Sequence, residues 1–255
     1  MTMTTMDVRA IAPLTHHEAM RLQAHELECT LALLRSLDDA AWTATTDCPA
    51  WDVRAMYQHV LGACEAGASM RENVHQLIRA RAHRKQHGGP LEAALTTVQV
   101  RERVDLSPAQ IVEQLAAIAQ RTVRARARTP ALVRNHARLA IDGPVHETWK
   151  LGYLIDTIYL RDLWMHRVDA AHALSRPLAL SADHDGRIVA DVAAEWARRH
   201  GQPFVLELTG PAGGTYAHDP DLPEAELVSL DAVEFCRTLA GRAQPTGLLA
   251  TIVPF

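Results

Sequence analysis

Apolar residues recur every three or four positions over much of the N-terminal two thirds of the chain, which is the spacing of one face of an α-helix. In the first such segment the apolar face consists of Met20, Ala24, Leu27, Leu31 and Leu34. Thr15 and Glu18 precede this face in the pattern of a capping box, in which each side chain accepts a hydrogen bond from the other residue's backbone. The pattern therefore predicts a helix over residues 16–37.

Three further segments have the same periodicity. Asp52 stands where it would favour the first turn of a second helix, whose apolar face contains Met56, Val60, Ala63, Gly67 and Met70. Ser107, Pro108 and Gln110 form a second capping box that predicts a helix over 108–128. A fourth helix is expected over 146–173. The segments 84–107 and 130–146 have no such pattern and are expected to be loops, so residues 1–176 are predicted to form an antiparallel four-helix bundle.

The pattern changes after Pro177. A capped amphipathic helix is expected over 181–200, with Gly201 ending it. Alternating residues then predict short strands, and Asp231 begins a last helix that Gly241 ends. The expected strands cover 204–209, 215–218 and 225–229, and 248–253 is expected to be a final strand or an extended tail. The fold class is therefore α+β, with a bundle over 1–176 and a small α+β domain over 177–255.

The fourth predicted helix has polar residues on its apolar face. Leu151, Ile155 and Ile158 set that face, and its continuation passes through Asp162, His166 and Asp169. An ionised carboxylate in a protein core is costly unless it is paired or bound to a metal. Because residues four apart project from the same side of a helix, Asp162 and His166 suit metal binding, and Asp169 is expected either to accept a hydrogen bond from His166 or to pair with an arginine.

His59 lies at the edge of the apolar face of the second helix, from where it can reach a neighbouring helix. Together with Asp162 and His166 it would supply two nitrogens and one oxygen. A fourth position would stay open, as in catalytic zinc sites. The alternative is an Asp–His ion pair of purely structural importance, because this spacing also occurs without a metal.

The composition limits the classes of function. The chain has 255 residues, of which 48% are hydrophobic, and a net charge of -4, so a nucleic-acid partner is not expected. No apolar signal segment and no apolar run of about 20 residues is present, so we expect a cytoplasmic protein without a membrane partner. The four cysteines form no Cys-x-x-Cys pair and are expected to be reduced thiols, with Cys48 a small packed residue.

Two segments resemble a known family. Residues 46–62 (TDCPAWDVRAMYQHVLG) and 161–171 (RDLWMHRVDAA) are similar to the DinB-like metal-binding bundle of the mycothiol-dependent maleylpyruvate isomerases. Residues 231–242 and 247–255 look like the C-terminal domain of that family, so the resemblance extends over nearly the whole chain. It implies the bundle fold, a divalent metal, usually zinc, and mycothiol as a thiol cosubstrate.

The resemblance also implies residue roles. The metal would be held by His59, Asp162 and His166, although the isomerases have Glu where this chain has the shorter Asp162. A C-terminal arginine at the active site is also implied, and Arg237 and Arg242 are the candidates. The other interpretation of these two arginines is that they cap the end of a helix.

The expected activity follows from an open metal site, because a coordinated thiol is deprotonated and nucleophilic at neutral pH. Mycothiol would attack a small electrophile, either isomerising a double bond or remaining attached as a conjugate. The alternatives are a metal-dependent hydrolase that activates water and a non-catalytic protein that binds a metal or a small ligand. The expected partners are a small-molecule electrophile and a low-molecular-weight thiol, and the protein is expected to be a monomer or homodimer.

Overall fold

The computed structural model of the chain describes residues 5–143 and 146–255. The fold is mostly helical with a small mixed sheet in its C-terminal part, which confirms the α+β class. The chain divides into two compact units. One consists of Thr15–Arg176, and the other combines the segment up to Leu14 with Pro177–Phe255. The segment before Thr15 was predicted to belong to the bundle. It contains a strand of only two residues, Met6–Asp7, which is too short to show a periodicity in the sequence. The strand with which it pairs lies about 200 residues farther along the chain.

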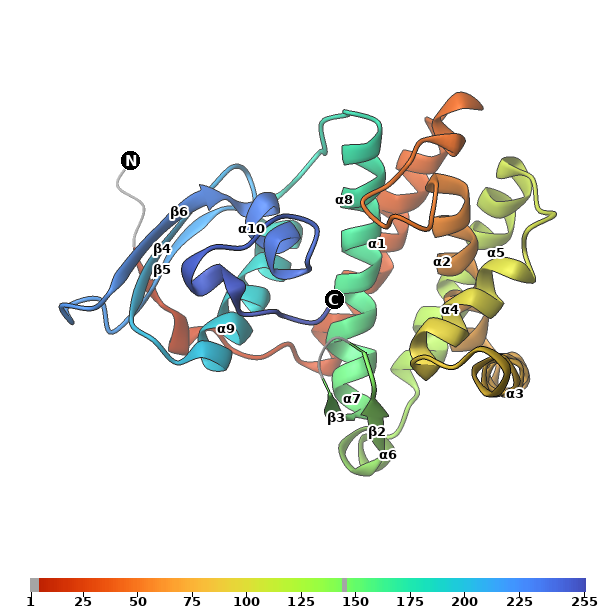
Figure 1. Ribbon diagram of the computed structural model, residues 1–255, viewed down its shortest axis with the longest axis horizontal. Helices are drawn as coiled ribbons and strands as arrows, with labels where there is room; N and C mark the ends of the chain where they lie inside the picture. The colour runs from red at the N-terminus through yellow and green to blue at the C-terminus, as the bar shows by residue number, and fades with distance from the viewer. Residues whose placement is uncertain (1–4, 144–145) are drawn as a thin grey trace. The chain divides into compact units, whose positions relative to one another are not determined.

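Four long helices form the core of the unit Thr15–Arg176. They are α1 (His16–Arg35), α2 (Val53–Ala68), α5 (Pro108–Ala127) and a continuous helix made of α7 (Leu151–Tyr153), the π-helical turn η3 (Leu154–Ile158) and α8 (Tyr159–Ala173). Helices α1 and α2 each pack against both α5 and α8, so the four helices close around one apolar core (Figure 1).

Two of these helices start at the predicted capping boxes, and α2 starts after Asp52, the residue predicted to favour its first turn. Both hydrogen bonds of the capping box form between Thr15 and Glu18 and between Ser107 and Gln110. The Asp52 side chain accepts a hydrogen bond from the backbone of Ala55 at 2.7 Å. These caps satisfy backbone donors that have no partner inside the helix, which is why local sequence predicts them well.

Two helices follow α2 and take up much of the segment 84–107, which was predicted to be a loop. The chain leaves α2 at Ser69, and α3 (Met70–His87) and α4 (Leu91–Arg101) follow, packed against each other and against α2. Ser69 is extended, with φ of −142° and ψ of 117°, and its side chain accepts a hydrogen bond from the backbone of Glu72. This cap starts a new helix, and the Ser-x-x-Glu spacing was its signal in the sequence.

The segment before α7 also differs from the prediction. Helix α6 (Ala131–His136) is followed by an antiparallel hairpin of β2 (Arg138–Ile141) and β3 (Glu147–Lys150). The helix predicted from residue 146 therefore begins at Leu151, because β3 satisfies its backbone groups by pairing with β2 rather than within a helix. Residues 144–145 of the predicted loop 130–146 lie outside the described residues.

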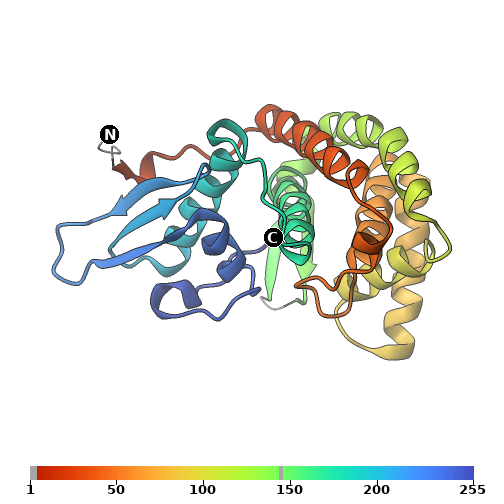
Figure 2. The ribbon, with the colours of Figure 1, turned by 90° about the horizontal axis from the view of Figure 1, so that it is seen from above.

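The second unit contains a four-stranded sheet with the order β1-β5-β4-β6. Its strands are β1 (Met6–Asp7), β4 (Phe204–Thr209), β5 (Gly214–His218) and β6 (Glu226–Asp231). Strand β4 is antiparallel to β5 and parallel to β6, and β1 is parallel to β5. Figure 2 shows these strands side by side. Instead of a final strand, the end of the chain has the short turn η5 (Gly247–Ala250) followed by extended backbone.

One face of this sheet is buried by helices. Phe204, Leu206 and Leu208 alternate with exposed or half-exposed residues along β4, and the buried face meets α9 (Arg187–His200) and α10 (Ala232–Leu239). The Trp196 ring contacts Phe204 and Phe235 at 4.8 and 5.4 Å between ring centroids. Period-two alternation therefore predicted the strand correctly.

Candidate metal centre

The three predicted metal ligands lie together inside the helical unit. His59 comes from α2, whereas Asp162 and His166 come from α8, and their ligand atoms all lie within 4.8 Å of one another. The His166 Nε2 atom is 3.3 Å from Asp162 Oδ1, and the His59 Nε2 atom is 3.8 Å from Asp162 Oδ2. Both histidines are buried, whereas 28% of the Asp162 side chain is exposed.

This geometry fits a metal ion. Ligands about 2.0–2.2 Å from a tetrahedral zinc ion lie about 3.3–3.6 Å from one another, which is close to the observed separations. Neither ring nitrogen of His166 has a hydrogen-bond partner among residues 5–143 and 146–255, although two carboxylates lie within ion-pair distance. A buried nitrogen in this state can bind a cation once it has lost its proton, and two imidazoles with one carboxylate are a donor set typical of zinc.

Trp51 covers both imidazoles. Its ring stacks on His59 with 5.1 Å between centroids and lies 6.2 Å from the His166 ring. The turn before α2 holds Trp51 in place, because the Thr46 hydroxyl donates to the Trp51 carbonyl oxygen at 2.9 Å. An indole in this position restricts ring rotation and water access. Trp51 was not identified from the sequence as a site residue, and its position eight residues before His59 gave no indication of this contact.

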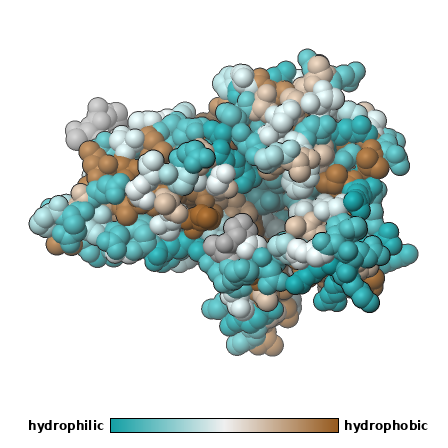
Figure 3. Space-filling model, viewed as in Figure 1, coloured by the Kyte–Doolittle hydropathy of each residue, from teal (hydrophilic) through white to brown (hydrophobic). Residues whose placement is uncertain are grey.

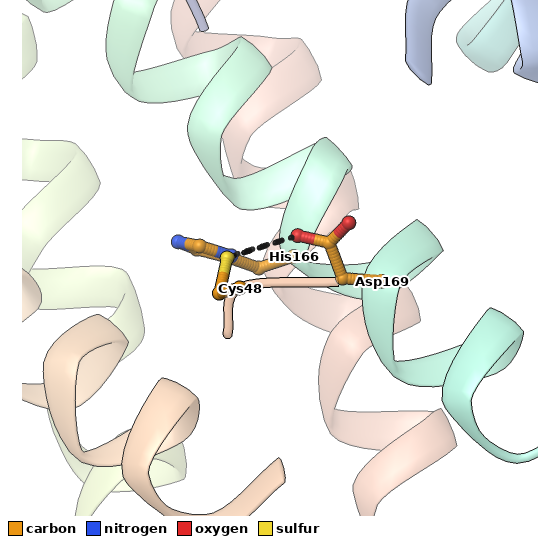
Figure 4. A group of neighbouring side chains, drawn as sticks. All are labelled: Cys48, His166 and Asp169. Atoms are coloured by element: carbon orange, nitrogen blue, oxygen red, sulfur yellow. Dashed lines mark hydrogen bonds and ion pairs between the residues drawn. The ribbon is translucent and has the colours of Figure 1, made fainter. Parts of the chain in front are cut away.

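Asp169 and Cys48 lie on the other side of the His166 ring. Asp169 Oδ2 is 3.4 Å from His166 Nδ1, and the Cys48 thiol donates a weak hydrogen bond to the same carboxylate at 3.8 Å (Figure 4). Asp169 is fully buried. A carboxylate at Nδ1 orients a metal-binding imidazole and favours the tautomer with a free Nε2, which is one of the two roles expected for Asp169.

The charges at the site reinforce one another. Burial lowers the pKa of His166, but the Asp162 and Asp169 carboxylates outweigh it and raise this pKa to about 9. Burial raises the pKa of Asp162, but the positive charge of His166 and the nearby His59 imidazole hold it well below its ordinary value. The metal-free site at neutral pH is therefore an ion pair between a protonated His166 and an ionised Asp162.

An interior cation lies near this site. The Arg126 guanidinium of α5 stacks 4.1 Å from the centroid of the Tyr159 ring, and Tyr159 precedes Asp162 by about one turn of α8. Arg126 also donates to Gln23 Oε1 at 2.8 Å. Burial raises the pKa of Tyr159, with a smaller opposing effect from Arg126, so the phenol is protonated at neutral pH. Neither residue was identified from the sequence, because both positions read as ordinary helical ones.

The two candidate arginines belong to the other unit. The Arg237 guanidinium pairs with Glu234 at 2.5 Å. The backbone N–H groups of Gly241 and Arg242 donate to the carbonyl oxygens of Thr238 and Arg237, which is a Schellman motif with Gly241 at φ of 77°. The Arg242 side chain donates to the Ala240 carbonyl oxygen at 3.0 Å. Of the two side chains, Arg242 therefore donates to a carbonyl oxygen at the end of α10, and a role of either arginine at the metal centre stays a prediction.

Comparisons with known proteins place the chain in a family and identify structures with the same fold. Residues 11–171 match the family model of the mycothiol maleylpyruvate isomerase N-terminal domain. Two crystal structures, one of mycothiol-dependent maleylpyruvate isomerase and one of a mutant of it with a histidine replaced by alanine, share the fold with TM-scores of 0.57. Each is 18% identical to this chain, and the match covers 94% of this chain and 93% of the other. None of the curated proteins compared with the chain matches it.

Among the described residues, no helix is both long and apolar enough to cross a bilayer. The face in Figure 3 is largely hydrophilic, with hydrophobic residues in small separate groups.

Proposed function

The chain belongs to the family of the mycothiol maleylpyruvate isomerase N-terminal domain, and on this premise we propose that it is a metal-dependent enzyme that uses mycothiol as its thiol cosubstrate. The observation that carries the proposal is the convergence of His59, Asp162 and His166 in the interior of the helical unit. Zinc is the proposed cation, since the donors are two imidazole nitrogens and one carboxylate oxygen. Mycothiol and a small electrophile are the proposed substrates.

A second set of donors, Cys48, His166 and Asp169, lies equally close together. We assign the metal to the first set because Asp169 is fully buried, whereas the Asp162 side chain is partly exposed. A catalytic metal needs an exchangeable position that a substrate can reach. The second set then has a different task, which is to orient the His166 ring from its Nδ1 side.

The residues have separate tasks in the proposed reaction. When bound, the cation favours the deprotonated form of a coordinated thiol, whose pKa is ordinarily near 8.5. His59 and His166 offer neutral nitrogen donors, and Asp162 contributes one negative charge. Trp51 covers the two imidazoles and excludes water from them. A dry site strengthens electrostatic interactions with the thiol.

The proposed chemistry is addition of the thiol sulfur to an activated carbon–carbon double bond. The sulfur donates an electron pair to form a C–S bond, and the π electrons move onto the conjugated carbonyl group. Rotation about the resulting single bond, followed by loss of the sulfur, regenerates the double bond in the other geometry. This isomerisation consumes no oxidant and returns the thiol. If a proton instead adds to the carbon, the conjugate persists and the enzyme is an S-transferase.

The test combines metal analysis with a thiol panel. The purified protein should contain about one zinc ion per chain, and His59→Ala should lose it, while the exposed His17→Ala is the matched control and should keep it. Activity toward maleylpyruvate and a model electrophile is then measured with mycothiol, glutathione, bacillithiol and cysteine. We expect turnover with mycothiol only in the zinc-loaded protein. Activity that needs no thiol would contradict the proposal, as would a His59→Ala variant with full metal content.

A further inference from the structure

A chain of buried side-chain amides connects His59 to helices outside the core of four helices. His59 Nδ1 lies 2.7 Å from Oε1 of Gln99 on α4. The Gln99 Nε2 group donates to Oε1 of Gln76 on α3 at 2.9 Å. Gln76 is fully buried and only 3% of Gln99 is exposed, so water does not substitute for these contacts. We refer to Gln99 and Gln76 as the amide relay.

The orientation of both amides is set at the outer end of the relay. The Gln76 Nε2 group donates to the Gly62 carbonyl oxygen and to Glu72 Oε1, each at 2.9 Å. Glu72 also forms an ion pair with Arg103 at 3.2 Å. A carbonyl oxygen and a carboxylate only accept hydrogen bonds. The Gln76 amide nitrogen must therefore face them, and its oxygen must face Gln99.

The orientation of Gln76 also fixes the orientation of Gln99, and through it the tautomer of His59. Because Gln76 presents an oxygen, Gln99 must direct its amide nitrogen to Gln76 and its own oxygen to His59. A reversed amide would place two donors or two acceptors against each other in a buried site, where unsatisfied groups are costly. An oxygen at His59 Nδ1 requires a proton on that nitrogen. In neutral His59 the lone pair then lies on Nε2, the atom that faces Asp162.

The relay also depends on a close approach of α2 and α4. A Cβ atom added at Gly62 would lie 2.8 Å from both Cβ and Cγ of Gln99, so only glycine leaves room for Gln99 at this point. Arg103 holds the end of α4 against α2, since its guanidinium pairs with Glu65 of α2. The contact between α2 and α4 therefore determines where Gln99 lies relative to His59.

The two imidazoles are consequently oriented by different chemistry. His166 has the charged carboxylate of Asp169 at Nδ1, whereas His59 has a neutral amide oxygen. An amide oxygen orients the ring and fixes its tautomer without adding a second buried negative charge. This matters because Asp162 is already ionised beside both rings.

We propose that Gln99 and Gln76 are positioning residues that hold His59 as the Nδ1–H tautomer, with Nε2 permanently available as a metal donor. The inference rests on the proposed function, because it assigns a purpose to Nε2. The inference can nevertheless be tested without metal, because the His59 tautomer in the metal-free protein depends on the relay and not on zinc binding.

The decisive variant is Gln99→Met, which keeps the length of the side chain and removes the acceptor. Long-range ¹H–¹⁵N spectra of the metal-free protein at about pH 8 should show His59 protonated on Nδ1 in the wild type, and mixed or Nε2-protonated in Gln99→Met. The His59 signals are assigned by their absence from His59→Ala. Zinc affinity should fall by about 10–100-fold in Gln99→Met. Gln99→Glu, which restores an acceptor, should recover the Nδ1–H tautomer.

Two further variants control for damage to the fold. Gln120→Met makes the same chemical change on an exposed position of α5 and should change neither tautomer nor zinc affinity. Gln76→Met disturbs the relay one residue farther from His59. If Gln99→Met does not fold, the His59 tautomer is measured in Gln76→Met instead, with the same expected change. An unchanged His59 tautomer in the folded relay variants would overturn the proposal. If the wild type shows the Nδ1–H tautomer but binds no zinc, the relay stands and the proposed function fails.

Discussion

The metal-free protein should lose stability as the pH rises through about 9, because His166 then releases its proton. The pKa of His166 is about 9 in the folded chain, against an ordinary value of 6.5 in the unfolded chain. A group whose pKa is raised by folding contributes stability that is complete below the unfolded value and disappears above the folded one. At about 1.4 kcal/mol per pH unit, protonation of this buried side chain stabilises the metal-free fold by up to about 3 kcal/mol.

The assay is urea denaturation in the presence of a chelator at several pH values between 6 and 10. Asp162→Asn provides the reference, because it removes the charge that does most to raise the pKa of His166 while other groups titrate as before. We expect the loss of stability between pH 6.5 and 9.5 to be clearly smaller in Asp162→Asn than in the wild type. A His166 ring that titrates at or below pH 7 in the metal-free wild type, measured by NMR, would refute the reasoning.

The proton on His166 should also weaken the binding of zinc at lower pH. A metal ligand must be deprotonated, so zinc binding releases the proton of His166 below pH 9. The apparent zinc affinity should therefore weaken about tenfold for each pH unit lowered between pH 9 and 7. Competition with a chromophoric chelator of known pH dependence measures this slope. A pH-independent affinity over that interval would show that His166 binds no metal or carries no proton.

Three other changes test the packing around the site. Glu26→Gln should lower the free energy of unfolding by about 3–5 kcal/mol in urea denaturation, because it breaks the buried ion pair of Glu26 with Arg167 at 2.6 and 2.9 Å. A decrease below about 1 kcal/mol would contradict this expectation. Gly62→Ala should cost about 1–3 kcal/mol by forcing a Cβ to within 2.8 Å of a side chain of α4, and a stability equal to wild type would show that α4 moves freely. Cys48 is half-buried and should react with a thiol reagent in the native protein. Burial raises the pKa of Cys64 to about 11, so this thiol should react only after unfolding. Equal labelling rates of the two cysteines would contradict this packing.

The helix starts illustrate what local sequence can predict. The capping boxes at Thr15 and Ser107 need only residues three apart, so the sequence contains everything that determines them. Two regions illustrate the limit. Strand β3 exists because it pairs with β2, and α4 packs on α3 and α2 although its own sequence has only a weak apolar stripe. Tertiary contacts override local preference in both cases.

By itself, the sequence determined the α+β class, the caps, the alternating strand β4 and the helical phase that brings Asp162, His166 and Asp169 to one face of α8. These properties depend on residues within one or two turns of each other, or on period-two alternation. Only the tertiary structure decided that His59 reaches that face, that Trp51 covers both imidazoles and that Gln99 and Gln76 orient His59 from α4 and α3. The physical reason is that these contacts, apart from that of Trp51 with His59, join residues 23 to 115 positions apart in the chain. Their approach depends on the packing of whole helices and on features such as the missing side chain of Gly62.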